Sequence, residues 1–200
     1  MQTARRDVFD SQCEAITVTH AEIGSPRREQ AESFIRTVFA RHHAADVTSF
    51  APNLMLFEQE RRIVAACGWR PAAAEALFLE CYLEQPIEQA MAGLAQQPVR
   101  REEIVEVGNL AAEKPGGTIQ VVLRLTAHLD RLGYKWLVFT ATRELIGILN
   151  RLGLPALALA PADPQRLGEA AGTWGSYYST QPIVVAGRIR TALARVGRRA

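Results

Sequence analysis

The sequence predicts an α/β fold in which helices flank a mixed central sheet. Two apolar stretches, 104–112 and 136–142, have the composition of buried strands, and a segment with helical periodicity follows each of them. Earlier in the chain, residues 54–58 and 63–70 are apolar runs joined by the polar turn 59–62, which is typical of an antiparallel hairpin. Strands that are joined both by helices and by a tight turn belong to a mixed sheet.

The first third of the chain begins with an alternating, β-branched segment, 15–20, which predicts a first strand. A helix follows, because Ser25 is a favourable N-cap and Pro26 fits the first helical position. The helix has apolar residues at the spacing of one buried face, and we expect it to end near Arg41. Residues 46–52 then form a loop.

The remaining elements are predicted by periodicity and by the glycines that end them. Helices are expected at 87–95, 118–132 (closed by Gly133) and 143–152 (between Thr142 and Gly153); strands at 157–160 and 183–186; a short apolar segment at 77–82; a polar connector at 96–103; and an aromatic-rich loop at 172–182. No repeat or long linker divides the chain. We therefore expect one domain over residues 1–200, with a loose leader at 1–13 and an Arg-rich tail at 187–200.

Composition limits the classes of function. A net charge of +2 gives no indication of DNA binding, and the tail residues Ile189, Leu193 and Val196 lie at helical spacing among five arginines. This tail has two readings that the sequence leaves open. It lies on an anionic membrane or an acidic carrier protein, or it is a frayed basic end.

The cysteines and histidines predict a protein with reduced thiols and without a metal site. The three cysteines are odd in number and lack C-x-x-C spacing, which is typical of a cytosolic protein. Residues 1–10 lack the apolar core of a secretory signal, and no run is long enough for a transmembrane helix. The histidines have no Cys or carboxylate partners at ligand spacing. We expect a cytoplasmic protein without a metal ion or a transmembrane segment.

The stretch 104–117 carries the strongest indication of chemistry. Glu106 is a carboxylate inside an apolar strand, which is costly unless the group is paired or used. We interpret Glu106 as a general base; a solvent-facing or Arg-paired side chain is the alternative. Asn109 is a candidate donor to an oxyanion, or else a side chain that ties down a strand bulge. Lys114, Gly116 and Gly117 open a helix and predict a phosphate cradle, or a simple turn.

Other polar and aromatic positions complete the candidate site. Arg70 ends a strand and is expected to hold a substrate carboxylate, or to form an ordinary salt bridge to Glu80 or Glu106. Trp174, Tyr177 and Tyr178 form an aromatic cluster that lines a site or caps a core. The aromatic residues Phe50, Trp69, Phe78 and Phe139 suit an acyl-chain wall and would serve equally as core.

Several motifs together resemble the bacterial thermostable hemolysin family, over roughly residues 25–190. They are Phe50–Leu54, Ala65–Arg70, Leu77–Leu83 with Pro86–Glu88, Ile104–Ala111, Phe139–Thr142, and Trp174–Tyr178 with Pro182. This family is in turn similar to the acyl-homoserine-lactone synthases and to the Gcn5-related N-acyltransferase fold. The family name refers to a lytic phenotype.

The resemblance assigns roles to particular residues. Cys67–Arg70, Phe78 and Glu106–Asn109 occupy places comparable to the Cys-x-Arg, Phe and Glu-x-Ser-Arg elements of the lactone synthases; here Cys-x-Arg has an extra residue, and Gly108-Asn109 replaces Ser-Arg. The implied roles are catalytic for Glu106, Asn109 and Tyr178 (which would protonate a leaving thiolate); substrate-binding for Arg70, Trp69, Phe78, Phe139, Thr140 and Trp174; and cofactor-binding for Leu110, Ala111, Lys114, Gly116 and Gly117.

The resemblance also implies the reaction. We expect transfer of an acyl group from acyl-CoA, or from the phosphopantetheine of an acyl carrier protein, to the amine of a small molecule such as an amino acid. Two alternatives are a membrane-acting hemolysin, and a protein of the same fold that uses a non-thioester donor such as aminoacyl-tRNA.

Overall fold

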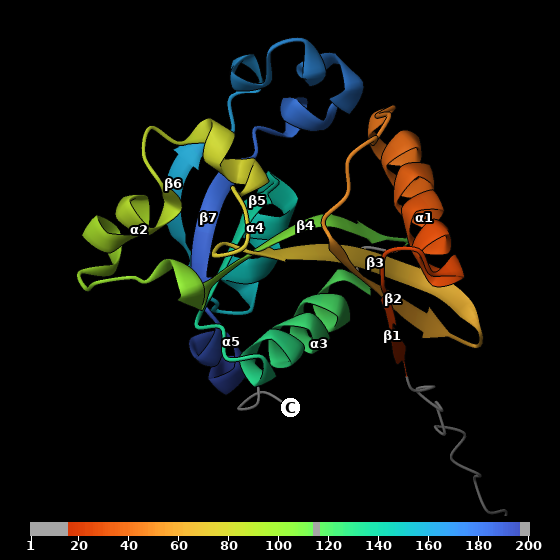
Figure 1. Ribbon diagram of the computed structural model, residues 1–200, viewed down its shortest axis with the longest axis horizontal. Coiled ribbons are helices and arrows are strands. Elements are labelled where there is room, and N and C mark those ends of the chain that lie inside the picture. Colours follow the sequence, from red (N-terminus) through yellow and green to blue (C-terminus); the bar gives the residue numbers. More distant parts are fainter. Residues whose placement is uncertain (1–15, 114–116, 197–200) are drawn as a thin grey trace, which may run out of the picture.

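The computed structural model describes residues 16–113 and 117–196, and within them lies a seven-stranded sheet (Figure 1). The strands are β1 (Thr17–Ala21), β2 (Asn53–Gln59), β3 (Arg62–Pro71), β4 (Ile104–Ala112), β5 (Trp136–Ala141), β6 (Leu157–Pro161) and β7 (Ile183–Arg188). Their order in the sheet is β1-β2-β3-β4-β5-β7-β6. Only the β4–β5 pair is parallel among these described strands. The predicted mixed sheet is confirmed.

The four predicted helices are present in the predicted order, and a fifth lies in the segment predicted as a tail. They are α1 (Pro26–His43), α2 (Ile87–Ala95), α3 (Gly117–Arg131), α4 (Arg143–Arg151) and α5 (Ile189–Val196), with short 3₁₀ helices η1 (Phe78–Tyr82), η2 (Arg101–Glu103), η3 (Pro164–Trp174) and η4 (Tyr177–Thr180). Two predicted caps are confirmed, since Ser25 Oγ accepts from the Arg28 N–H at 3.3 Å and Thr142 Oγ1 accepts from the Leu145 N–H at 3.3 Å.

The β2–β3 hairpin closes without a glycine. Glu60 and Arg61 both have positive φ angles, of 50° and 65°. Two consecutive residues with positive φ are the requirement of the turn that matches the twist of adjacent strands. The predicted hairpin is confirmed.

The C-terminal region differs from the sequence prediction. The last strand, predicted to end at residue 186, extends to Arg188, and the predicted tail contains helix α5. Ile189 is only 1% exposed and packs in the same core cluster as α3, with Leu193 beside it. The part of the apolar face that Ile189 and Leu193 form is therefore covered by protein. The segment predicted as a loop at 172–182 contains the end of η3 and all of η4. The predicted leader, 1–13, lies outside the described residues.

The sheet has α1 on one face and α3 with α5 on the other (Figure 1). On β2 and β3, alternation divides the side chains, because Leu54 and Leu56 pack under α1, whereas Met55 and Phe57 pack under α3. On β4, Val105 and Val107 belong to the α3 core cluster, and Ile104 packs with η1 and α2 in a third cluster. Glu106 thus points to the face that η1 covers.

The sheet opens between β4 and β5. These strands pair only from Ile104↔Trp136 to Val107↔Phe139, and β4 then continues along β3 alone. The β3–β4 register jumps between Gly68↔Gly108 and Ala66↔Ala111, so two residues of β4 lie opposite one residue of β3. This is a β-bulge, and Asn109 within it has a φ angle of +50°. No helix of the described residues is both long and apolar enough to cross a membrane.

Candidate functional site

A cavity of about 490 Å³ lies where β4 and β5 part. Its walls come from the last turns of α1, the loop before β2, η1, β4, β5, the first turns of α4 and the segment 174–178. The lining residues that carry polar groups or aromatic rings are Phe39, His42, His43, Ser49, Arg70, Phe78, Tyr82, Glu106, Asn109, Glu113, Phe139, Thr140, Thr142, Glu144, Trp174, Tyr177 and Tyr178.

Glu106 is the buried carboxylate of this cavity, with 5% of its surface exposed. Its two oxygens accept hydrogen bonds from the backbone N–H groups of Phe78 at 2.8 Å and Leu79 at 3.0 Å. Burial raises the pKa of Glu106 to about 7, although Arg70 and the two N–H groups act to lower it. Removal of the carboxylate from water is therefore the larger effect, and the group titrates near neutral pH.

Arg70 is the cationic partner of Glu106. Its Nε lies 3.4 Å from Glu106 Oε2, and its Nη1 lies 3.6 Å from a carboxylate oxygen of Glu75. Both separations exceed the 2.7–2.9 Å of a tight charge-assisted hydrogen bond. Of the two salt bridges predicted as alternatives for Arg70, the one to Glu106 is formed.

A second ion pair holds η1 in place beside Glu106. Glu80 accepts from the backbone N–H groups of Leu77 at 2.8 Å and Ile87 at 2.9 Å, and it pairs with Arg101 at 2.6 Å. The hydrogen bond from Arg101 is the largest cause that lowers the pKa of Glu80, to about 2. Arg101 also donates to the carbonyl of Ala72 at 2.7 Å. These contacts fix the loop whose N–H groups reach Glu106.

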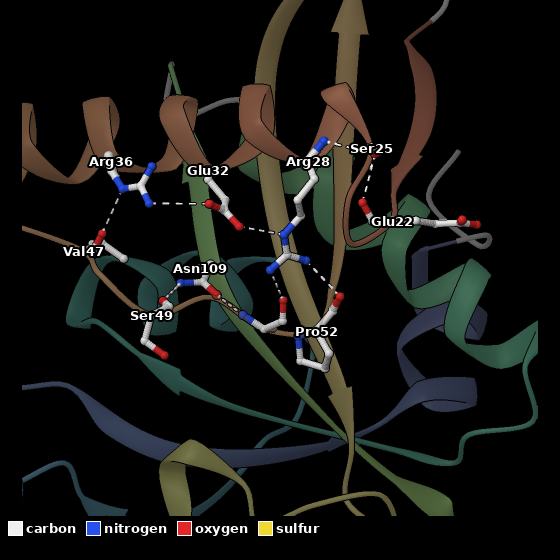
Figure 2. Close-up of polar contacts among 10 residues, drawn as sticks. Glu22, Ser25, Arg28, Glu32, Arg36, Val47, Ser49, Pro52 and Asn109 are labelled. Atoms are coloured by element: carbon white, nitrogen blue, oxygen red, sulfur yellow. Dashed lines mark hydrogen bonds and ion pairs between the residues drawn. The ribbon is translucent and has the colours of Figure 1, made fainter.

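Asn109 contacts the loop before β2 through both ends of its side chain. Its Oδ1 accepts from the Ala51 N–H at 2.9 Å, and its Nδ2 donates to the Ser49 carbonyl at 3.2 Å (Figure 2). These are the contacts expected of the alternative reading, in which Asn109 ties down a strand bulge. A catalytic role for Asn109 stays a prediction.

Aromatic rings form a continuous wall around the cavity. Trp174 lies 5.8 Å from Phe78, 5.4 Å from Tyr177 and 6.2 Å from Tyr178 between ring centroids. The hydroxyl groups of Tyr178 and Tyr82 share a hydrogen bond. Burial raises the pKa of Tyr178 to about 12 and also raises that of Tyr82. Both hydroxyls therefore stay protonated across the physiological range.

The aromatic segment 174–178 is anchored to the end of α1. The Ser176 N–H donates to the His43 carbonyl at 2.8 Å, and the Asp46 N–H donates to the Thr173 carbonyl at 2.7 Å. Gly175, between these bonds, has a φ angle of +51°, and a Cβ there would overlap the His43 carbonyl oxygen. Only glycine fits this contact, in which the C-terminal end of α1 meets the segment (Figure 1).

Most of the predicted site residues meet in this cavity. They are Glu106, Asn109, Tyr178, Arg70, Phe78, Phe139, Thr140, Trp174 and Leu110. Lys114 and Gly116 lie outside the described residues, and Gly117 is the first residue of α3. Among the described residues, no three His, Cys, Asp or Glu side chains form a group that would hold a metal ion.

Two predicted residues lie elsewhere, and strand alternation is the reason. Trp69 follows the opposite face from Arg70 and packs in the α3 core, 6.0 Å from His128 and 6.2 Å from Tyr134 between ring centroids. Ala111 is 1% exposed and belongs to the core under α1. Neither residue reaches the cavity.

The sequence prediction missed residues that the fold brings in from a distance. Tyr82 lines the cavity and bonds to Tyr178, which is 96 positions away. Phe39 and His43 extend the aromatic wall from the last turns of α1. Tyr177 stood in the predicted aromatic cluster but received no role of its own. Helical periodicity placed Phe39 on the buried face of α1 without a role in the site, and it gave no signal for His43.

One known family covers most of the chain. Residues 21–193 match the family model described as thermostable hemolysin. The chain belongs to the thermostable hemolysin family. The predicted family membership is thus confirmed. A search of curated proteins finds no significant match.

Solved structures show the fold of this thermostable hemolysin family member. The acyl-homoserine-lactone synthase LasI has 12% identity and a TM-score of 0.61, covering 90% of this chain and 95% of that one. FeeM, an N-acyl amino acid synthase from uncultured soil microbes, has 12% identity and a TM-score of 0.61, covering 90% and 96%. The CoA-dependent lactone synthase BjaI, with SAM and isopentyl-CoA, has 11% identity and a TM-score of 0.60, covering 92% and 89%. The predicted Gcn5-related N-acyltransferase-like fold is confirmed.

Proposed function

We propose that this protein is an acyltransferase that moves an acyl group from a thioester to the amine of a small molecule. The observation that carries the proposal is Glu106, a buried carboxylate with a pKa of about 7 in the wall of a cavity. A general base is most effective when its pKa lies near the working pH. LasI, FeeM and BjaI, which are synthases of acylated products, support this class of reaction.

The cavity is long enough for two substrates. Glu106 and Glu113 both line it, and at roughly 3.3 Å per residue the wall along β4 between them measures on the order of 20 Å. We assign the acceptor amine to the end with Glu106. The donor thioester then enters from the other end, past Leu110 and the first turn of α4.

The donor in this proposal is acyl-CoA or an acyl group on the phosphopantetheine of a carrier protein. The structure of BjaI with isopentyl-CoA supports a donor of this type. A helix N-terminus favours anions. Lys114, Gly116 and Gly117, at the junction of β4 and α3, would hold the donor phosphate there.

The acceptor in this proposal is an amino acid or a similar amine that carries a carboxylate. Arg70 lines the cavity beside Glu106, and its contacts of 3.4 and 3.6 Å leave the guanidinium loosely engaged. A substrate carboxylate bound to Arg70 would place the amine of the same molecule near Glu106. The aromatic side chains Phe78, Phe139 and Trp174 would then surround the acyl chain, with Thr140 at the end of β5.

The chemical step is nucleophilic attack. The amine nitrogen bonds to the thioester carbonyl carbon, the amine proton passes to Glu106, and the carbon–sulfur bond breaks to release a thiolate. Backbone N–H groups of β4, freed where β5 no longer pairs, would stabilise the oxyanion. Holding the two substrates together supplies much of the rate.

The role of Tyr178 follows from its acidity. An ordinary thiol has a pKa of about 8.5, whereas the pKa of Tyr178 is raised to about 12. Tyr178 is therefore the weaker acid, and full proton transfer from it to the thiolate is unfavourable. In this proposal it donates a hydrogen bond to the departing sulfur, and the thiolate takes its proton from water or from Glu106.

The test measures thiol release by the purified protein from a panel of acyl-CoA thioesters, with amino acids as acceptors. Thiol release that stops when the amine is left out, and that is lost in the control variant Glu106→Gln, supports the proposal. Dye release from liposomes without thiol release supports the membrane-acting alternative instead. A melting temperature that rises with aminoacyl-tRNA but not with CoA supports a non-thioester donor.

A further inference from the structure

The bulge of β4 has a backbone conformation that needs support. Asn109 adopts a φ angle of +50°, in the left-handed region that residues other than glycine occupy rarely, with Asn and Asp the commonest exceptions. The register leaves Asn109 and Leu110 opposite Cys67 alone, and pairing with β5 has already ended at Val107. Strand pairing therefore does little to fix the shape of this segment.

The support comes from a side-chain clamp onto the loop 47–52. The Asn109 carboxamide binds the backbone of this loop at both ends, at 2.9 Å to Ala51 and 3.2 Å to Ser49 (Figure 2). An amide that is bonded to backbone at both ends is poorly available to a substrate.

The same loop is held from its other side by α1. Arg28 donates from Nη2 to the Ala51 carbonyl at 2.9 Å and from Nη1 to the Pro52 carbonyl at 2.8 Å, while its Nε pairs with Glu32 at 2.7 Å. Arg36 donates to the Val47 carbonyl at 3.3 Å. Figure 2 shows that Arg28, Arg36 and Asn109 all contact the backbone of this loop. The loop thus joins α1 to the bulge.

The loop also rests directly on β3. A Cβ at Gly68 would lie 2.8 Å from the Ala51 Cβ and 3.1 Å from Asn109 Oδ1. This close approach leaves no space for the loop to move toward the sheet. The loop and the bulge are both part of the cavity wall, through Ser49 and Ala51 on one side and residues 108–110 on the other.

We propose that Asn109 is a positioning residue that fixes the β4 bulge and the loop 47–52 as one rigid wall of the cavity. It acts through the backbone of Ser49 and Ala51 and does not contact the substrate. The inference rests on the proposed function, in which N–H groups of this part of β4 face the oxyanion. Because this wall is rigid, the N–H groups of β4 keep their orientation toward the oxyanion in the transition state.

The first test replaces Asn109 by Gly, which removes the clamp without forcing a side chain into the positive φ. In the thiol-release assay we expect kcat to fall ~10-fold or more, with the KM for acyl-CoA within about twofold of wild type, because oxyanion donors act in the transition state. Arg28→Ala, which releases the loop from α1, should give the same pattern. The double variant should be less impaired than the product of the two single effects.

The matched control is Asn53→Ala. Asn53 is the first residue of β2, donates from Nδ2 to the Trp69 carbonyl at 3.2 Å and does not line the cavity. The Asn53→Ala variant loses one side-chain-to-backbone hydrogen bond, against the two lost in Asn109→Gly, and should keep the kcat of wild type. Equal losses of kcat in Asn53→Ala and Asn109→Gly, or a wild-type kcat in Asn109→Gly, would overturn the positioning role.

A second measurement does not depend on activity. Hydrogen exchange should become faster in Asn109→Gly at residues 49–51 and 108–112 together, and stay unchanged there in Asn53→Ala. Unchanged exchange in Asn109→Gly would overturn the clamp, whatever the activity. If the wild-type protein releases no thiol from any donor, the proposed function fails, and the exchange result alone then decides whether Asn109 holds this wall.

Discussion

Arg70 and Glu106 are direct neighbours across β3 and β4, with Arg70 Nε 3.4 Å from Glu106 Oε2. The side chains are 16% and 7% exposed. A guanidinium at this distance lowers the pKa of a carboxyl group, and two backbone N–H groups lower it further, yet the pKa of Glu106 stays near 7 because burial acts more strongly. The pair therefore contains a carboxylate that exchanges its proton at neutral pH, beside an open cavity.

The first prediction concerns the proposed base. Glu106→Gln keeps the size of the side chain and removes its basicity. We expect turnover in the thiol-release assay to fall by ~10²-fold or more, since general-base catalysis contributes about 10²–10⁴-fold.

The fold of this variant must be checked alongside its rate. Glutamine keeps one oxygen that can accept from Phe78 or Leu79, so circular dichroism and gel filtration should match the wild-type protein. A folded Glu106→Gln protein with unchanged turnover would remove Glu106 from the mechanism.

The second prediction concerns the pH dependence of the rate. The base must be deprotonated to act, so turnover should rise with pH and level off above about pH 7. Arg70 lowers the pKa of Glu106, and Arg70→Gln should therefore move the midpoint of the rate profile to higher pH. The measurement is kcat/KM against pH for both proteins.

Arg27→Gln is the matched control for this shift. Arg27 also pairs with a glutamate, Glu58, but it does not line the main cavity. Its loss should leave the midpoint in place. A midpoint that stays unchanged in Arg70→Gln as well would show that the rate does not report on Glu106.

The third prediction concerns stability against pH. The pKa of Glu106 is about 7 in the folded protein and 4.5 without the fold, so the folded state binds the proton more tightly between these values. The contribution of Glu106 to the free energy of unfolding is fully present below pH 4.5 and is lost as the pH rises through 7. Its size is roughly 3 kcal/mol, because each unit of pKa difference corresponds to about 1.4 kcal/mol. The free energy of unfolding of wild type should therefore fall over this window relative to Glu106→Gln.

Denaturant unfolding at several pH values measures this difference. Other groups act in the opposite direction at lower pH, because the pKa of Glu80 is lowered to about 2 and its contribution is lost as the pH falls below 4.5. Subtracting the Glu106→Gln curve of unfolding free energy against pH from the wild-type curve removes the contribution of Glu80, which both proteins share. Parallel curves for wild type and Glu106→Gln between pH 4.5 and 7 would contradict the raised pKa.

Local pattern was sufficient to predict most of the fold and part of the site. Apolar composition marked β4 and β5, and Ser25 and Thr142 marked helix starts that the structure confirms. The same alternation that makes β3 a strand also separates Trp69 from Arg70, so assigning both to one site conflicted with the strand prediction.

The remaining site residues depend on contacts between distant segments. The bond between Tyr82 and Tyr178, and the clamp from Asn109 to a loop some 60 positions earlier, exist only once the sheet and the crossing loops are in place. A single sequence carries no record of such pairs, and the bulge that gives Asn109 its positive φ leaves no periodic signal.

The last prediction compares two glycines that face each other across β3 and β4. A Cβ at Gly68 would lie 2.8 Å from the Ala51 Cβ and 2.9 Å from a methyl of Leu54, both in buried positions. Gly68→Ala should therefore lower the free energy of unfolding by about 1–3 kcal/mol, the usual effect of forcing an extra methyl into a packed core. Denaturant unfolding at fixed pH is the measurement.

Gly108→Ala is the matched variant, because a Cβ there meets nothing within 4 Å and Gly108 lines the cavity. The added methyl should leave stability within about 0.5 kcal/mol of wild type, as for substitutions without packing conflict. It should instead reduce the space beside Glu106 and raise the KM for bulky acyl donors or acceptors. A Gly68→Ala protein as stable as wild type would show that the loop 47–52 does not rest on β3 as described, and a destabilised Gly108→Ala protein would show that the space beside Gly108 is not open.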